Sequence, residues 1–357
     1  MIDIVCGGQF GDEGKGQIAV WLTHTRRNAG RPFFFAVRVG SSAAEHRFET
    51  KDEQRYTGRV LPVAGWVDPD VKLVLGAGHV IKLESLKSEV ESLTRRFGPG
   101  QERRIYIDRN AGVIRPEHVQ ASEKTKWRGS THQGGGASMA HKVLRDGEYK
   151  TAAAYKELGE FNILDTAELM ADWLKQSFHG LLEGSQGALL SLNHGYYPFC
   201  TAKDVTPAAL LAEAGIAMHW VRHIWTVFRT VPMRVPGNSG PYAGAELTWE
   251  RLEDHTEKKL PEGVKRQTDS GERERIFCWS WYEYKRAIHL TGPTHLALTF
   301  ADWYAPSLNG GVTLEDHIKT MEEIAGCPVY IVRRGAAYGD FSIGKYLAEK
   351  IIREKLI

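Results

Sequence analysis

The chain has 357 residues, with 46 Lys or Arg against 44 Asp or Glu, so its formal net charge is +2 at pH 7. This balance favours neither a nucleic-acid binder nor a protein with an acidic tail, and no nucleic-acid partner is expected. No apolar run reaches the roughly eighteen residues of a transmembrane helix, so we expect no transmembrane helix and no membrane partner. The N-terminus lacks the basic region and the long apolar stretch of a signal peptide. We therefore expect a cytoplasmic protein whose four cysteines are reduced.

The first predicted element is a strand over residues 2–6, followed by a glycine-rich stretch and by a helical pattern that starts at Ile18. Short apolar runs predict further strands at 33–39, 71–75, 104–107, 181–184, 295–300 and 329–332. Helical periodicity covers residues 80–97 and ends at a Gly-Pro-Gly sequence, and a second helical pattern covers 208–214. Strands that alternate with helices predict an α/β fold. We expect one large domain over residues 1–357, P-loop-NTPase-like, around a mostly parallel central sheet with loop and helix excursions.

The stretch after the first strand, Gly-Gly-Gln-Phe-Gly-Asp-Glu-Gly-Lys-Gly at residues 7–16, is typical of a phosphate-binding loop. Glycines let backbone N–H groups approach an anion, and the following helix N-terminus favours negative charge. Lys15 adds a point charge for a phosphoryl group. The common Gly-x4-Gly-Lys-Ser/Thr pattern is absent, because Gln17 follows Gly16. A carboxylate pair, Asp12-Glu13, is costly beside phosphate unless it binds a metal or moves a proton.

Three blocks resemble the adenylosuccinate synthetase family. The loop at 7–16 is similar to the family's opening signature. The run from Glu183 to Thr201, which begins Glu-Gly-Ser-Gln-Gly, resembles its Glu-Gly-Ala-Gln-Gly…His-Gly-x-Tyr-Pro-x-x-Thr block. The segment 129–136 with the trailing Lys-Val-Leu-Arg at 142–145 is similar to a second phosphate loop of the family. The likeness is strongest over residues 1–210, and the chain length matches the compact archaeal and phage forms.

The resemblance implies a two-step ligation that needs Mg²⁺, a purine nucleoside monophosphate, L-aspartate and a nucleoside triphosphate. Asp12 matches the family's general base, which is also a magnesium ligand together with the backbone of residue 45, here Glu45. His46 matches its general acid, in a motif where Ala43, Glu45 and Arg47 replace the usual residues. The catalytic residues implied are Asp12, Lys15, His46 and Gln186. The residues implied for the triphosphate are Gly11, Glu13, Gly14, Lys15, Gly16 and Arg47.

The same resemblance implies a binding site for the purine nucleotide. Thr131 and Thr201 match threonines that bind the 5′-phosphate, and Gln186 matches a glutamine that contacts the purine. Arg145 matches an arginine that reaches the phosphate from the neighbouring subunit, which implies a homodimer with shared sites. The full set implied for the purine nucleotide is Ser130, Thr131, Arg145, Gln186, Leu190, Thr201 and Val235.

Two recognition loops depart from the family. In the aspartate-binding loop, glutamates occupy two arginine positions, and the remaining candidates are Thr268, Ser270, Arg273 and Arg275. At the donor-base strand end the candidates are Phe300, Asp302 and Gly335, with Phe300 in place of a lysine. An aromatic ring stacks on any base, so ATP or dATP becomes the expected donor, with GTP possible.

These departures resemble the phage-type branch of the family, the 2-aminoadenylosuccinate synthetases, which use dGMP on the route to diaminopurine DNA. In that case the enzyme acts in the host cytoplasm. The retained Asp12 keeps an alternative open, an IMP-using adenylosuccinate synthetase of purine biosynthesis. Two hypotheses of other classes are a catalytically silent nucleotide-binding relative and a kinase-like enzyme that does not ligate.

Overall fold

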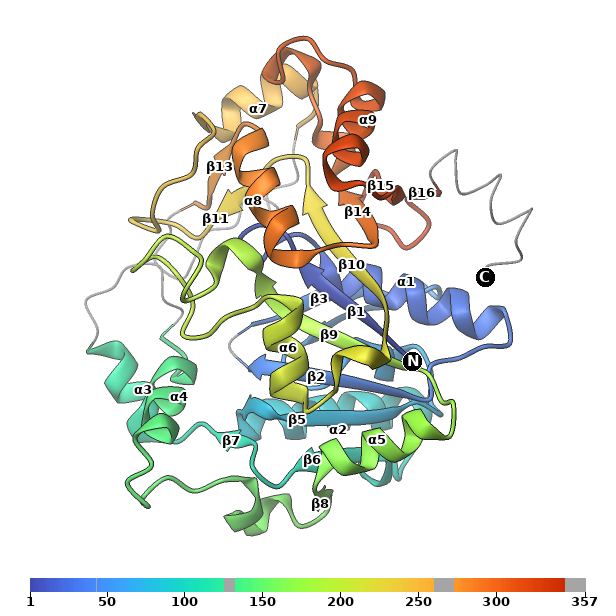
Figure 1. Ribbon diagram of the computed structural model, residues 1–357, viewed down its shortest axis with the longest axis vertical. Coiled ribbons are helices and arrows are strands. Elements are labelled where there is room, and N and C mark those ends of the chain that lie inside the picture. Colours follow the sequence, from blue (N-terminus) through green and yellow to red (C-terminus); the bar gives the residue numbers. More distant parts are fainter. Residues whose placement is uncertain (43, 125–131, 260–272, 344–357) are drawn as a thin grey trace.

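The computed structural model of the protein describes residues 1–42, 44–124, 132–259 and 273–343. Within these ranges eleven strands form one sheet in the order β16-β15-β14-β10-β1-β9-β2-β5-β6-β8, with β7 paired to β5 (Figure 1). Every pairing is parallel except that of β15 with β16. The strands are β1 (Ile2–Gly7), β2 (Phe35–Ser41), β5 (Lys72–Ile81), β6 (Ile105–Asp108), β7 (Gly112–Val113), β8 (Asn162–Leu164), β9 (Gly180–Gly187), β10 (Val221–Arg229), β14 (His295–Thr299), β15 (Val329–Arg333) and β16 (Phe341–Ile343). The predicted α/β fold with a mostly parallel sheet is confirmed.

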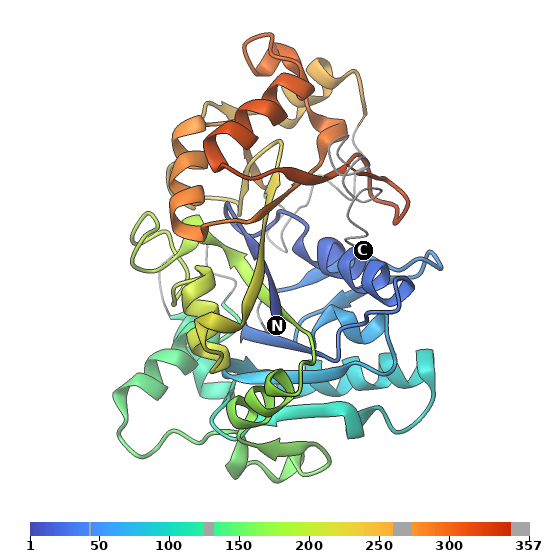
Figure 2. The same ribbon diagram turned by 45° about the vertical axis from the view of Figure 1, so that its right-hand side comes forward.

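Helices cover both faces of this sheet. In Figure 2, α5 and α6 lie on the opposite side of the sheet from α1. The helices are α1 (Lys15–Asn28), α2 (Leu83–Phe97), α3 (Pro116–Glu123), α4 (Gly135–Leu144), α5 (Thr166–Lys175), α6 (Pro207–Ala214), α7 (Trp249–Thr256), α8 (Trp281–Thr291) and α9 (Leu314–Ala325). In the part of the chain that is described, none of them combines the length and the apolar character that crossing a membrane requires.

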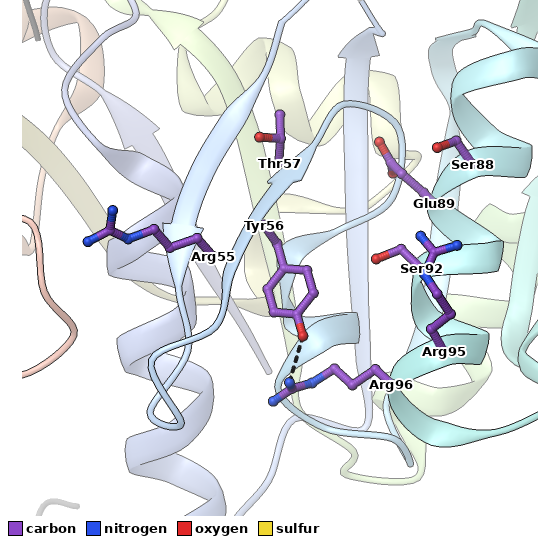
Figure 3. Close-up of a pocket in the computed structure, with 8 residues that line it drawn as sticks. All are labelled: Arg55, Tyr56, Thr57, Ser88, Glu89, Ser92, Arg95 and Arg96. Carbon is purple, nitrogen blue, oxygen red and sulfur yellow. Dashed lines mark hydrogen bonds between the residues drawn. The ribbon is translucent and has the colours of Figure 1, made fainter. Parts of the chain in front are cut away.

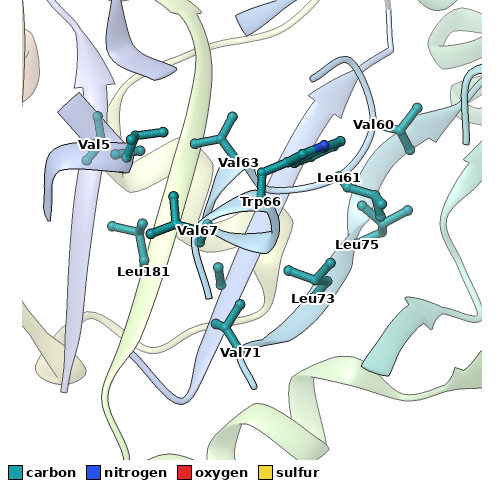
Figure 4. Packing of buried hydrophobic residues seen from close by; sticks show 14 of the residues in the cluster. Val5, Val60, Leu61, Val63, Trp66, Val67, Val71, Leu73, Leu75 and Leu181 are labelled. Carbon is teal, nitrogen blue, oxygen red and sulfur yellow. The ribbon is translucent and has the colours of Figure 1, made fainter. Parts of the chain in front are cut away.

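Two apolar clusters cover the two faces of the central strands, one on each side of the sheet. Ile4 and Cys6 of β1 pack on the α5–α6 side, whereas Val5 packs on the α1–α2 side. Successive side chains of a strand point to opposite faces, so a strand that is buried on both sides reads as a continuous apolar run. On the α1–α2 side Trp66 packs close to Leu61 and Val63 (Figure 4). A third core joins α8 and α9 to β10, β14 and β15.

Two small sheets stand apart from the central one. The hairpin β3 (His46–Glu49) and β4 (Arg55–Gly58) packs against α1. The antiparallel sheet of β11 (Met233–Arg234), β13 (Arg275–Phe277) and β12 (Glu246–Leu247) has its own apolar cluster, which includes Trp249 of α7. Both small sheets follow the carboxyl ends of central strands, which is the edge where parallel α/β sheets place their ligand sites.

Several element boundaries differ from those predicted. The helix expected from residue 80 begins at Leu83, because Val80 and Ile81 extend β5 and pair with Gly112 and Val113 of β7. The apolar pair fits either element, and only the pairing with β7 decides between them. The second strand runs from Phe35 to Ser41, two residues later than expected at both ends. Its register shifts between Arg38 and Gly40, where the strand enters the site.

Candidate active site

The glycine-rich loop lies between β1 and α1, at the centre of the sheet. Gly14 caps α1 with a left-handed backbone (φ 81°), a conformation that glycine adopts at little cost. The buried carboxylate of Glu13 organises the loop. Its Oε1 accepts the N–H groups of Gln9 (2.8 Å) and Gly11 (3.0 Å), and its Oε2 binds Lys15 Nζ at 2.7 Å. Lys15 also donates to the carbonyl of Gly11 at 2.7 Å. The loop is therefore folded onto an anion that belongs to the chain itself.

The loop touches three separate segments of the predicted site. A Cβ atom placed on Gly16 would lie 2.7 Å from Cβ of His46, so only glycine allows β3 to approach α1 this closely. A Cβ atom placed on Gly11 would lie 3.5 Å from the backbone of Gln186 and 3.9 Å from the side chain of Leu190. The structure thus brings the loop together with His46, Gln186 and Leu190.

On its other side the loop meets the predicted donor-base segment. A Cβ on Gly14 would lie 4.0 Å from the ring of Phe300 and from Nη1 of Arg333. Thr299 Oγ1 donates to the carbonyl of Glu13 at 2.7 Å, which fixes the end of β14 to the loop. Asp302 is half-buried, and burial raises the pKa of its carboxyl group. Gly335 lies just beyond Arg333, after β15.

His46 belongs to a buried network of ionisable side chains from three strands. Its Nδ1 lies 2.5 Å from Oε1 of Glu183 in β9, and Arg38 of β2 lies 3.6 Å from the same oxygen. The second carboxylate oxygen of Glu183 accepts the N–H of Val63 at 2.8 Å. The charged carboxylate can only accept, so Nδ1 carries the proton. Within the described ranges His46 Nε2 is buried without a hydrogen-bond partner.

The charges of this network set the protonation of the imidazole. Burial, followed by the positive charge of Arg38, lowers the pKa of His46 to about 4 although Glu183 opposes the shift. The pKa of Glu183 is also lowered, because the contacts with His46 and Arg38 outweigh burial, which acts to raise it. Both directions agree with a neutral imidazole beside an ionised carboxylate. Arg38 further donates to the carbonyls of Leu61 and Ala44, each at 3.1 Å.

Asp12 lies half-buried in the loop and is tied to β10 through Arg229, which is 2% exposed. Arg229 Nη1 donates to the carbonyl of Asp12 at 2.9 Å, and its guanidinium lies 4.0 Å above the ring of Phe300. The side chain of Gln9 exchanges two hydrogen bonds with the backbone of Arg229. Arg229 therefore positions a predicted catalytic residue and a predicted donor-base residue together. The sequence analysis missed this arginine, although an arginine that ends an apolar strand is a usable signal.

The segment predicted to bind the purine nucleotide is held against the loop. Gln186 has a positive φ of 64°, and Thr201 donates its N–H to the carbonyl of Leu190 at 2.8 Å. Val235 follows Arg234, which donates to the carbonyl of Phe199 at 3.0 Å. Ser130 and Thr131 lie outside the described residues.

Arg145 stands at the other end of α4 from this region. It is exposed at the C-cap, whereas Gly136 in the first turn of the helix packs against Ala202. A ten-residue helix spans about 15 Å. The structure therefore does not bring Arg145 to the nucleotide segment of its own chain.

The predicted aspartate-binding arginines are engaged on the small antiparallel sheet. Arg273 binds Glu250 at 2.7 Å, and Nε of Arg275 binds Glu246 at 2.8 Å. Thr268 and Ser270 lie outside the described residues. Arg47, the alternative cation, is exposed on β3 and binds Glu45 at 2.7 Å.

A cavity among the described residues lies away from these segments. It has a volume of about 440 Å³ between β4 and α2. Figure 3 shows that Tyr56 reaches across it to Arg96, with Ser88, Ser92 and Arg95 on the helix side. None of its lining residues is a predicted site residue.

Comparison with known proteins gives the same answer as the three sequence blocks. A family model described as adenylosuccinate synthetase matches residues 4–157 and 146–308. The adenylosuccinate synthetase of Methanococcus aeolicus is 32% identical over 343 residues, which cover 93% of this chain and 96% of the relative. That of Methanocaldococcus jannaschii is 32% identical over 348 residues, which cover 93% of each chain.

Two solved structures share the fold. Cyanophage S-2L succinoaminodeoxyadenylate synthetase, bound to dGMP and dATP, matches with a TM-score of 0.82 and 27% identity over 96% of this chain and 95% of that one. Fully ligated adenylosuccinate synthetase from Plasmodium falciparum matches with a TM-score of 0.76 and 17% identity, covering 96% and 99% of the two chains. The chain therefore belongs to the adenylosuccinate synthetase family, whose members are C–N ligases.

Proposed function

We propose that the protein joins L-aspartate to C6 of a 6-oxopurine nucleotide and uses a nucleoside triphosphate to turn O6 into a leaving group. The observation that carries the proposal is the buried Nε2 of His46, which has no hydrogen-bond partner among the described residues while Glu183 holds Nδ1. Negative charge brought by phosphoryl and oxo oxygens raises the pKa of a nearby imidazole. His46 then protonates at Nε2 and donates to the oxygen on which charge develops.

In the first step Asp12 accepts the proton of purine N1, and O6 attacks the γ-phosphorus of the triphosphate while the nucleoside diphosphate leaves. Lys15 and the loop N–H groups neutralise charge on the phosphoryl group in flight. In the second step the neutral amine of aspartate attacks C6 and then loses a proton to solvent, and the C6–O6 bond breaks with inorganic phosphate as the leaving group. Each ligation thus releases one nucleoside diphosphate and one phosphate.

We propose that the carboxylate of Asp12 and the backbone carbonyl of Glu45 would bind Mg²⁺. Within the described ranges no three His, Cys, Asp or Glu side chains form a metal cluster. Of the two loop carboxylates, Glu13 is bound to Lys15, and one carboxylate such as Asp12 is a donor set that Mg²⁺ accepts, since this ion keeps several waters and binds substrate phosphates. When bound, the ion neutralises charge on the phosphates.

We propose dGMP as the purine substrate and ATP or dATP as the donor. The likeness to a cyanophage enzyme bound to dGMP and dATP supports both choices. Phe300 supports the donor choice, because an aromatic ring beside the loop stacks on a base without reading guanine. IMP is the second candidate. The archaeal relatives at 32% identity carry the name adenylosuccinate synthetase, and Asp12 is retained.

A homodimer with Arg145 shared between the sites completes the proposal. Arg145 stands about 15 Å along α4 from the nucleotide segment of its own chain. The two residues before it, Val143 and Leu144, are 73% and 69% exposed, and such apolar exposure next to a cation suits a subunit interface.

A product assay by mass spectrometry tests the proposal over IMP, GMP and dGMP combined with ATP, dATP and GTP. The expected result is an aspartate adduct, formed with phosphate release that requires both the purine nucleotide and aspartate. Asp12→Ala and His46→Ala should each lower turnover by about 10²-fold or more while the nucleotides still bind. Turnover at the wild-type rate in either variant contradicts the assigned roles. Absence of phosphate release indicates a silent relative, and release that ignores aspartate indicates a kinase-like enzyme.

A further inference from the structure

A buried ion pair lies beside the predicted nucleotide segment. Lys203, two residues after Thr201, is 9% exposed and its Nζ binds the carboxylate of Glu213 on α6. Burial lowers the pKa of Lys203 and raises the pKa of Glu213. Each group is thus held in a place that disfavours its charge, and a buried pair of this kind adds little net stability.

The ammonium of Lys203 faces the point where the chain leaves β2. A Cβ atom on Gly40 would lie 3.4 Å from Lys203 Nζ and 3.1 Å from Oγ of Ser185. Gly40 has a φ of 118°, so the backbone bends at this point in a way that glycine alone tolerates well. The backbone of Lys203 is fixed as well, because its carbonyl accepts the N–H of Leu192 at 3.1 Å.

The first turn of α4 closes the same region. A Cβ on Gly135 would clash with Oγ of Ser41, and a Cβ on Gly136 would lie 3.2 Å from Cβ of Ala202. The first turn of this ten-residue helix therefore packs against the end of β2 and against the residue before Lys203, and the first four N–H groups of a helix have no partner within it. A helix N-terminus beside a lysine favours an anion.

The charge and polarity of the surroundings also favour an anion. Lys142 of α4 is a second cation in the region: its charge acts to lower the pKa of Glu213, while its ammonium donates to the carbonyls of Ala77 and Asn110. His79, the register partner of Gly40, is fully buried, and neither of its ring nitrogens has a hydrogen-bond partner among the described residues. The positive charges of Arg38 and Lys203, after burial, lower its pKa well below the usual value.

We propose that Lys203 binds the 5′-phosphate of the purine nucleotide and that Glu213 holds the lysine in place until the phosphate arrives. The proposal rests on the proposed function, since it names a further contact in that binding site. A phosphate that lies between Lys203 and the first turn of α4 gains a charge-assisted hydrogen bond, which is stronger than a neutral one. Glu213 competes with the phosphate for the same ammonium group.

Calorimetric binding of dGMP and IMP, and of the matching nucleosides, tests the proposal without triphosphate or aspartate. Lys203→Met should weaken binding of the monophosphates by about 10- to 100-fold and leave nucleoside binding within about twofold, because the nucleosides lack the phosphate. Glu213→Gln should tighten monophosphate binding, because it removes the competitor for Lys203. Lys175→Met is the matched control, since Lys175 is a surface lysine paired with Asp172, and it should bind like the wild type.

The two substitutions separate phosphate binding from a structural role. If the ion pair only holds the fold, Lys203→Met and Glu213→Gln weaken monophosphate binding alike, and the proposal is overturned. Wild-type affinity in folded Lys203→Met overturns it as well, while the proposed ligase function remains intact. Failure of the wild-type protein to bind any purine monophosphate refutes the proposed function itself.

Discussion

Replacing Glu183 by Gln tests how His46 is held. The glutamine keeps the shape of the side chain but presents an N–H group to one of two donors, His46 Nδ1 (2.5 Å) or Val63 N (2.8 Å). It also removes the negative charge 3.6 Å from the buried guanidinium of Arg38. Breaking a buried ion pair costs about 3–5 kcal/mol of folding stability. The hydrogen bond from His46 to the charged Glu183 is worth about 1.5–3 kcal/mol. If that much stabilisation is lost in the transition state, Glu183→Gln should lower kcat by up to about 10²-fold.

Phosphate release at saturating substrates measures kcat for this variant, and calorimetry checks that the nucleotides still bind. Asp108→Asn is the matched control. It also removes a buried carboxylate, which accepts the N–H and hydroxyl of Thr166 at 3.0 and 2.8 Å, but it lies outside the predicted site. The control should lose stability and keep kcat. A folded Glu183→Gln enzyme with kcat within threefold of wild type, or an equal fall in Asp108→Asn, refutes the reasoning.

Three further predictions concern the donor, the acid stability and the dimer. Phe300→Ala should raise KM for the triphosphate about tenfold and leave KM for the monophosphate unchanged, because one stacked base is worth about 1–3 kcal/mol; an equal rise in both constants contradicts the assignment. His79→Leu should be more acid-stable than wild type. The folded pKa of His79 lies well below its unfolded value of 6.5, so wild-type stability falls as pH drops below 6.5. The free energy of unfolding of the variant relative to wild type, obtained from thermal unfolding, should rise by about 1.4 kcal/mol between pH 8 and pH 5.5. If the stability of the variant and of the wild type depends on pH in the same way, this linkage is wrong. Mixing inactive Asp12→Ala with inactive Arg145→Leu should restore up to a quarter of wild-type activity, because half the dimers are mixed and each then has one intact site. If the two variants exchange subunits and activity does not recover, Arg145 does not act across an interface.

The sequence predicted the elements of the fold better than their ends. A strand, a glycine-rich loop and a helix follow one another locally, so the pattern at residues 2–22 determines them. The start of α2 was misplaced because Val80 and Ile81 pair with β7, about thirty residues later in the chain, and periodicity does not register such a partner.

The buried charges of the site were the harder part. Arg38, Glu183 and Arg229 stand on β2, β9 and β10, which become near neighbours only through the strand order β10-β1-β9-β2. Their positions in the chain give no hint of that order. A charged residue inside an apolar run is nevertheless a signal, because such a side chain is buried only with a partner.

The carboxylate of Glu13 has a consequence for how tightly the loop can bind. Two of the loop's backbone N–H groups and the ammonium of Lys15 converge on it. The conformational entropy of ordering these groups is therefore lost during folding and not at the moment of binding, but the same carboxylate competes with an incoming phosphate for the ammonium of Lys15. Because this anion is part of the chain, its presence beside Lys15 does not depend on a bound nucleotide.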